Sequence, residues 1–370
     1  MKTNSVLPRL LLASCIVSVL VACGNNTANV ETSANTTASA GTATLAANVS
    51  LQHMAVDSFR PPASTEAQES PFKPRDMLVA PMPASVSLGV PPASQGAAMQ
   101  KSNEAAAAAS ASGSPMAKPL LVGFGRDVAQ TSTAAATQQV LKWQPTASGG
   151  QVAAINFVST GAKGIRLGLL VTQLPETATL RYYAKGATTT FEVKGADVLK
   201  VLAINLAAGD KSDAGRTYWA PGIDAANATL EIELPMGINS STVKVAMPQV
   251  MHMTMSTDDV NEQPAISAMS SGTDGAKIDM TCQVDVTCET TLPAASNAVA
   301  RLYYIFDTPG GLAAAVCSGT LLNDSVSSGT PYILTANHCL STQTVASTLE
   351  SKFQYRSKVC NIATNYTYFD

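Results

Sequence analysis

Short runs in which apolar and polar residues alternate are the feature that most constrains the fold of this chain. They recur within residues 119–256 and again after residue 298, and Gly, Pro, Asn and Asp interrupt them. A period of two is typical of strands with one buried face, and many short strands favour an antiparallel sandwich. We therefore expect an all-β protein with an antiparallel β-sandwich-like domain at 119–256. The strands expected there span 165–171, 180–184, 190–193, 230–234 and 243–247, and later strands span 299–306, 313–322 and 332–334.

Three local patterns within 119–256 are open to more than one interpretation. In 230–234 the apolar residues share one face and Glu231 and Glu233 the other, so we expect solvated glutamates rather than a catalytic carboxylate pair. The stretch 123–126, Gly-Phe-Gly-Arg, lacks the third glycine of a dinucleotide fingerprint, which favours a tight turn. The stretch 251–255 places three methionines on one face of a strand with His252 opposite, which predicts an ordinary packed strand rather than a copper site.

The N-terminus has the pattern of an export signal. Lys2 and Arg9 flank a short start, and an apolar run at 10–21, too short to span a bilayer, leads into Leu-Val-Ala-Cys23. This ending resembles the lipobox of bacterial lipoproteins. The resemblance implies a signal peptide at 1–22 and a lipid on Cys23 that anchors the exported chain in a bacterial membrane, from which processing would release it. The alternative is an ordinary signal peptide with an incidental cysteine, and export follows from both.

Residues 23–118 are rich in Ala, Thr, Ser and Pro, which predicts a tether or linker because such a composition cannot bury a core. A second, Gly- and Ser-rich linker is expected at 257–277. Charged residues make up 13% of the chain, the formal net charge is -3, and no run of Lys or Arg could follow a phosphate backbone. We therefore expect no nucleic-acid ligand.

Cysteine usage constrains the last hundred residues. Of the seven cysteines, Cys15 lies in the signal and Cys23 is assigned to the lipid. Exported domains usually pair their cysteines, so an odd remainder leaves one orphan, either a free thiol or one with a partner elsewhere. The five that remain are Cys282, Cys288, Cys317, Cys339 and Cys360.

The most specific pattern is Cys317-Ser-Gly-Thr-Leu followed by Pro-Tyr-Ile-Leu-Thr-Ala-Asn-His338-Cys339. It resembles the chymotrypsin-like serine peptidase family, in which a strand beginning Cys-x-Gly-(Ser/Thr)-Leu pairs with one ending Leu-Thr-Ala-x-His-Cys. The resemblance implies a Cys317–Cys339 disulfide that holds His338 at a strand end and, by closing a loop of about 21 residues, contributes roughly 3 kcal/mol. It also implies that His338 is the general base towards a serine hydroxyl and then the general acid towards the leaving amine.

Cys282-x5-Cys288 and the later Cys360 resemble the lysyl-endopeptidase-like bacterial branch of this family. The branch implies a Cys288–Cys360 disulfide and a far downstream partner for Cys282, which makes Cys282 the orphan left by a C-terminal truncation. It also implies that 119–256 is a proregion, that activation cleavage falls in 257–277, and that 278–370 is the incomplete first barrel of a two-barrel trypsin-like domain. Such a proregion would help the barrel to fold and keep it inactive until cleaved.

The other members of a catalytic triad are not evident after His338. Residues 339–370 contain two acids, Glu350 and Asp370, and no Gly-x-Ser-Gly; Asp370 lies too near Cys360 to be the expected triad acid. We therefore expect the precursor of an exported serine endopeptidase, acting on proteins or peptides without a metal or cofactor, that is inactive in this 370-residue form. Its primary specificity cannot be predicted from these residues.

Two alternatives remain open at this stage. One is a non-catalytic surface lipoprotein whose β-sandwich serves binding or adhesion and whose peptidase part is a degenerate remnant. The other is a C-terminal end that does not fold, because one barrel without the second would expose an apolar face. Labelling by a probe for serine nucleophiles would separate the peptidase from the first alternative.

Overall fold

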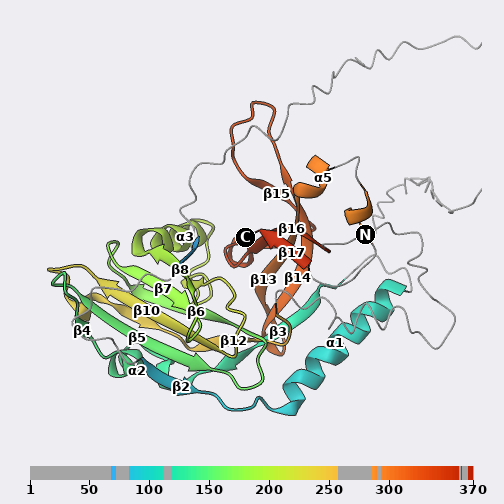
Figure 1. Cartoon of the computed structure of the whole chain (residues 1–370). Coiled ribbons are helices and arrows are strands. Elements are labelled where there is room, and N and C mark those ends of the chain that lie inside the picture. The colour runs from blue at the N-terminus through green and yellow to red at the C-terminus, as the bar shows by residue number, and fades with distance from the viewer. Residues whose placement is uncertain are drawn as a thin grey trace, which may run out of the picture. The chain divides into compact units, whose positions relative to one another are not determined.

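The computed structural model describes residues 68–71, 83–111, 118–256, 286–289, 293–357, 360 and 366–369 (Figure 1). We call 83–256 the N-terminal region and 286–369 the C-terminal region. Over the described residues the chain is mostly β and forms two sheets, which confirms the all-β prediction. None of the helices in this part of the chain is long and apolar enough to cross a membrane.

The first sheet has the strand order β1-β8-β7-β10-β5-β2, with β4 beside β5. Strand β2 runs parallel to β5, whereas the other pairs are antiparallel. The strands are β1 (Gln68–Pro71), β2 (Ala84–Ser87), β4 (Gln144–Pro145), β5 (Gln151–Val158), β7 (Thr179–Tyr183), β8 (Thr189–Lys194) and β10 (Asn227–Leu234).

The second sheet has the order β11-β6-β12-β3-β14-β13-β16-β17, with β9 beside β6 and β15 beside β14. Its strands are β3 (Leu120–Asp127), β6 (Gly164–Gln173), β9 (Thr217–Trp219), β11 (Lys244–Ala246), β12 (Gln249–Met253), β13 (Val299–Thr308), β14 (Gly311–Leu322), β15 (Tyr332–Leu334), β16 (Glu350–Ser357) and β17 (Tyr366–Phe369). Strand β3 pairs with β12 on one side and with β14 on the other. The N-terminal and C-terminal regions therefore share one sheet.

The apolar faces of the two sheets meet in a common core, as expected of a sandwich. On β10 the side chains of Leu230, Ile232 and Leu234 are fully buried, and they join Leu167 and Leu169 of β6 in the same cluster. The burial of these apolar side chains away from water is the main contribution that stabilises the folded N-terminal region over its unfolded state. The strands predicted at 165–171 and 230–234 are confirmed, but both faces of β6 and β10 carry buried residues instead of one buried and one exposed face.

Helices connect and cover the strands. They are α1 (Ala93–Ala111), α2 (Ala134–Val140), α3 (Gly195–Ala207), α5 (Pro293–Asn297) and α6 (Gln343–Ala346), with 3-10 turns η2 (Ala129–Thr131), η3 (Ser240–Thr242) and η5 (Val286–Cys288). Helix α3 was not predicted, although Val198, Leu202 and Asn205 recur at helical spacing and are buried. Helix α1 lies in the region predicted as a tether. Its Asn103 side chain is buried and hydrogen-bonds both the backbone N–H and C=O of Leu121.

The stretch 123–126 is part of strand β3, so the predicted tight turn is wrong. Its glycines allow close packing rather than a turn. A Cβ on Gly123 would lie 2.8 Å from the carbonyl oxygen of His252, and one on Gly125 would lie 3.0 Å from Cβ of Leu312 on β14. Alternating glycines in a strand mark such close approaches.

The predicted packed strand at 251–253 is confirmed. Met251 and Met253 of β12 enter one apolar cluster, while the His252 ring stacks on Phe124 at a centroid distance of 4.9 Å. The Nδ1 atom of His252 lies 2.8 Å from the Ser159 hydroxyl. Burial is the main reason, and the nearby positive charge of Arg126 the second, that the pKa of His252 is lowered to about 4.

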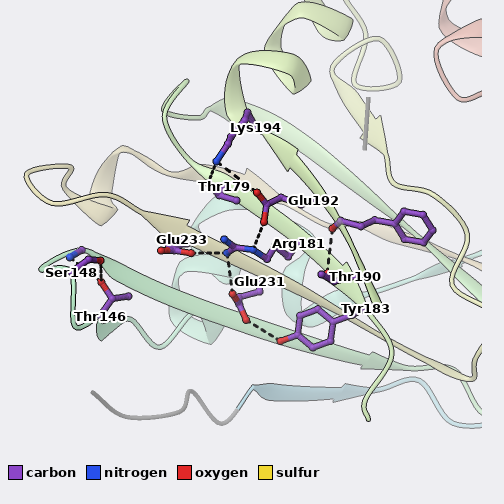
Figure 2. Close-up of polar contacts among 12 residues, drawn as sticks. Thr146, Ser148, Thr179, Arg181, Tyr183, Thr190, Glu192, Lys194, Glu231 and Glu233 are labelled. Carbon is purple, nitrogen blue, oxygen red and sulfur yellow. Dashed lines mark hydrogen bonds and ion pairs between the residues drawn. The ribbon is translucent and has the colours of Figure 1, made fainter. Parts of the chain in front are cut away.

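Glu231 is buried rather than solvated, which corrects the prediction for this residue. Figure 2 shows its contacts with Arg181 and Tyr183. Strands β7 and β8 place Arg181 beside Glu231 on one side and beside Glu192 on the other. The Arg181 guanidinium lies 2.6 Å from Glu192 and from Glu233 and 3.4 Å from Glu231. The Tyr183 hydroxyl donates a further hydrogen bond to Glu231. The polar face of this sheet therefore carries an ion-pair network, because cross-strand neighbours supply the cation.

Candidate functional site

His338 lies in a turn that follows strand β15. Strand β15 pairs with the end of β14, with Leu334 opposite Thr320. The turn is closed by a hydrogen bond of 2.9 Å from the Cys339 N–H to the Ala336 carbonyl. The Thr335 hydroxyl donates to the Ser318 carbonyl at 2.9 Å, which ties the start of the turn to β14. The predicted strands 313–322 and 332–334 are confirmed.

A disulfide between Cys317 and Cys339 joins β14 to the same turn, with the two Cα atoms 6.2 Å apart. Cys339 is 4% exposed and belongs to a small core with Tyr304 and Ala315. Gly319 leaves room for β13, because a Cβ at this position would lie 2.7 Å from the end of the Leu302 side chain and would force it to move. The Cys-x-Gly pattern thus reflects a close contact between β13 and β14.

The small core under the histidine turn also receives a side chain from the N-terminal region. Leu121 of β3 packs against it, together with Phe306, Leu340 and Val345. The Tyr304 hydroxyl lies 3.6 Å from the sulfur of Cys317, and burial raises the pKa of Tyr304 to about 12. No sequence pattern indicated that Leu121 would contribute to this core.

The His338 ring itself is exposed to solvent. A ring nitrogen lies within 4.8 Å of the sulfurs of Cys317 and Cys339. Those sulfurs are joined to each other and so offer no thiolate to a metal ion. An exposed imidazole at the end of a braced turn can accept and return a proton on a bound substrate.

The acids near His338 in sequence do not lie beside its ring among the described residues. Glu350, at the start of β16, accepts a hydrogen bond of 2.9 Å from the Gly222 N–H and lies 3.7 Å from the Arg166 guanidinium. Asp370 falls outside the described residues, as do Cys23 and Cys282. The structure therefore brings together His338, Cys317 and Cys339.

A second disulfide links Cys288 of η5 to Cys360, with a Cα–Cα distance of 4.8 Å. Both pairings that the family resemblance implied are present in the structure.

The strand that leads to the histidine turn exposes apolar side chains: Tyr332 and Leu334 of β15 are 51% and 61% exposed. Exposed apolar residues grouped on one short strand are typical of surfaces that contact another polypeptide.

Comparison with known proteins gives consistent matches on both regions. The family model described as the lysyl endopeptidase N-terminal domain matches residues 88–254, and the one described as the lysyl endopeptidase C-terminal domain matches 278–368. A curated lysyl endopeptidase of Pseudomonas aeruginosa is 27% identical over 251 residues, which cover 65% of this chain and 48% of that protein. The chain thus spans about half the length of this relative. No solved structure matches it.

Proposed function

The chain belongs to the lysyl endopeptidase family, and on that premise we propose that it is the precursor of an exported trypsin-like serine endopeptidase in which His338 is the general base. The observation that carries the assignment is the braced turn: His338 follows β15 directly, and the Cys317–Cys339 disulfide holds that turn against β14. A catalytic base requires such a fixed position relative to its substrate.

In the proposed mechanism, one ring nitrogen of His338 accepts the proton of a serine hydroxyl as the serine oxygen attacks the scissile carbonyl carbon. The imidazolium then donates that proton to the leaving amine, and a second cycle with water releases the acyl group. An acid would orient the ring through its other nitrogen. The serine and the acid are not assigned to residues of this chain, and peptide bonds are the proposed substrates.

The remaining assignments are proposals of the same kind. Residues 119–256 are the proregion, and the linker at 257–277 contains the activation cleavage. Residues 1–22 form the export signal, and a lipid on Cys23 anchors the precursor to a membrane before release. The 370-residue chain by itself has no peptidase turnover, because it contains no Gly-x-Ser-Gly sequence. Measurable hydrolysis by this polypeptide alone would overturn that statement.

The central test uses the whole product that the gene exports, including any residues beyond this 370-residue chain, and compares it with its His338→Gln variant. Peptide hydrolysis and labelling by a serine-directed fluorophosphonate are measured for both, with Asn337→Ala in the same exposed turn as the matched control. Loss of the base should lower kcat by at least about 10³-fold and suppress labelling, while Asn337→Ala stays close to wild type. Equal activity of His338→Gln and wild type would refute the assignment. Absence of labelling in the wild type would favour the non-catalytic lipoprotein.

A further inference from the structure

The Cys317–Cys339 disulfide and the His338 ring together form a cluster of three metal-ligating groups. The two sulfurs and a ring nitrogen of His338 all lie within 4.8 Å of one another. Tetrahedral zinc holds sulfur at about 2.3 Å and imidazole nitrogen at about 2.0–2.1 Å, so that its ligand atoms lie roughly 3.5–3.8 Å apart. Once the two sulfurs are no longer bonded to each other, small side-chain rotations are enough to reach that spacing.

Non-covalent contacts hold the three groups near one another independently of the disulfide. Strand β15, which leads into the histidine turn, pairs with the end of β14, the strand that carries Cys317. The Thr335 hydroxyl donates to the Ser318 carbonyl at 2.9 Å. The turn is closed by a hydrogen bond of 2.9 Å from the Cys339 N–H to the Ala336 carbonyl. We therefore expect reduction of the disulfide to leave both sulfurs and the ring within reach of one ion.

The surroundings of the cluster suit a divalent ion that is bound by thiolates. Cys339 is 4% exposed, Cys317 is half-buried and His338 is exposed, so an ion can enter from the solvent side. Two thiolates neutralise the charge of a divalent ion, and the half-buried site therefore needs no further acid. Thiolate and imidazole are the ligands that Zn²⁺ prefers, whereas Mg²⁺ and Ca²⁺ prefer oxygen.

Tyr304 supplies a group that would support the thiolate of Cys317. Its hydroxyl lies 3.6 Å from the sulfur of Cys317. Burial raises the pKa of Tyr304 to about 12, so the hydroxyl keeps its proton and can donate it to a thiolate. Hydrogen bonds of this kind to metal ligands fix their orientation and strengthen metal binding.

We propose that Cys317, His338 and Cys339 form a redox-gated Zn²⁺ site, which binds the ion only when the disulfide is reduced. In the gating step a dithiol reductant transfers two hydrogens to the two sulfurs. The S–S bond of the protein breaks, and an S–S bond forms in the reductant. Zn²⁺ then replaces the two thiol protons, which pass to solvent, and a nitrogen of neutral His338 and a water molecule complete four-fold coordination.

Bound Zn²⁺ would withhold His338 from proton transfer. A neutral imidazole has one unprotonated nitrogen, and once that nitrogen donates its lone pair to the ion the ring can accept no proton. Only this consequence rests on the proposed function, because metal binding itself does not require that His338 is a catalytic base. Oxidation of the two thiolates by an added small-molecule disulfide, which is itself reduced to thiols, would release the ion and restore the braced turn.

The test measures binding of Co²⁺, a spectroscopic substitute for Zn²⁺, to the full chain. Cys15→Ser, Cys23→Ser and Cys282→Ser are introduced throughout, so that thiols outside the described residues do not contribute. The chain is reduced with dithiothreitol, freed of the reductant without oxygen and titrated with Co²⁺. The reduced chain should develop the thiolate charge-transfer absorption and the visible bands of tetrahedral cobalt, and Zn²⁺ should remove both. The oxidised chain should show neither.

Matched variants identify the ligands. His338→Gln should weaken Co²⁺ binding by at least roughly 100-fold, because a ligand is lost. Tyr304→Phe should weaken it by roughly 10-fold, because the hydrogen bond to a ligand is lost. Asn337→Ala, in the same exposed turn, should leave the affinity unchanged. Cys288→Ala combined with Cys360→Ala should also leave it unchanged, because that cysteine pair has no third ligand among the described residues.

Circular dichroism of each reduced sample shows whether the β structure is retained. A reduced, folded chain without tetrahedral cobalt bands would overturn the inference, as would equal Co²⁺ affinity of His338→Gln and its parent. Loss of the β signal on reduction would also overturn it, because the site would then not be held together without the disulfide. None of these readouts measures hydrolysis, so failure of the metal site is distinct from failure of the proposed peptidase activity.

Discussion

Acidification below about pH 6 should destabilise the N-terminal region through His252. The Arg126 guanidinium donates to the Ser159 hydroxyl oxygen at 2.9 Å, and that hydroxyl lies 2.8 Å from Nδ1 of His252. The lowered pKa keeps His252 neutral, and in the tautomer whose Nδ1 is unprotonated the Ser159 hydroxyl donates to Nδ1. A proton on Nδ1 would break this hydrogen bond and place a second positive charge beside Arg126 in a buried site.

The magnitude follows from the pKa of His252, which falls from 6.5 to about 4 in the folded protein. The unfolded chain takes up the proton first as the pH drops, so the stabilisation is complete above pH 6.5 and is lost as the pH falls towards 4. The full difference corresponds to roughly 3 kcal/mol, of which about 2 kcal/mol should be lost between pH 8 and pH 5.

Urea unfolding followed by circular dichroism at pH 8, 6.5 and 5 measures this loss, with His252→Gln as the control that cannot titrate. The variant should be less stable at pH 8 but should lose less stability on acidification. The chain has three histidines, so NMR titration of the imidazole resonances can be assigned with single-site variants. A His252 pKa near 6.5, or identical pH profiles for wild type and variant, would refute the reasoning.

Three further perturbations test the fold around the two sites. Replacing Cys317 and Cys339 by Ala should reduce the free energy of unfolding of the C-terminal region by about 3 kcal/mol, measured by denaturant titration; a change below the error would contradict the bracing role. Glu231→Gln should lower the melting temperature more than Glu192→Gln, because the Glu231 side chain is 2% exposed and that of Glu192 38%. Equal shifts would argue against a buried network. Gly319→Ala should destabilise by roughly 1–3 kcal/mol, since its Cβ would overlap a β13 side chain, and an unchanged midpoint would show that β13 adjusts.

Local periodicity predicted most strands because it depends only on neighbouring residues. The strands at 165–171 and 230–234 were predicted from alternation alone. The interpretation of 123–126 was wrong because glycine signals a turn as readily as a close approach between strands, and only the neighbours His252 and Leu312 distinguish the two. Helix α3 was missed because a run of strand signals on both sides outweighed its own period.

The candidate site, like the fold, was predicted from the sequence only in part. The residues around Cys317, His338 and Cys339 resemble those of the chymotrypsin-like family, and that resemblance implied the histidine turn and the disulfide that the structure contains. The apolar partner Leu121 and the ionic partner Arg166 come from strands more than 150 residues earlier in the chain. No local pattern encodes such partners.

The sequence by itself determined the β class, the histidine turn and the cysteines that brace it, since each depends on a short-range pattern. Only the tertiary structure decided that β3 pairs with β14, that Glu350 is shared between Arg166 and Lys352, and that Glu231 is buried. The physical reason is that strand edges and charges are generic: many partners could satisfy them, and the packing of the whole chain selects which ones do.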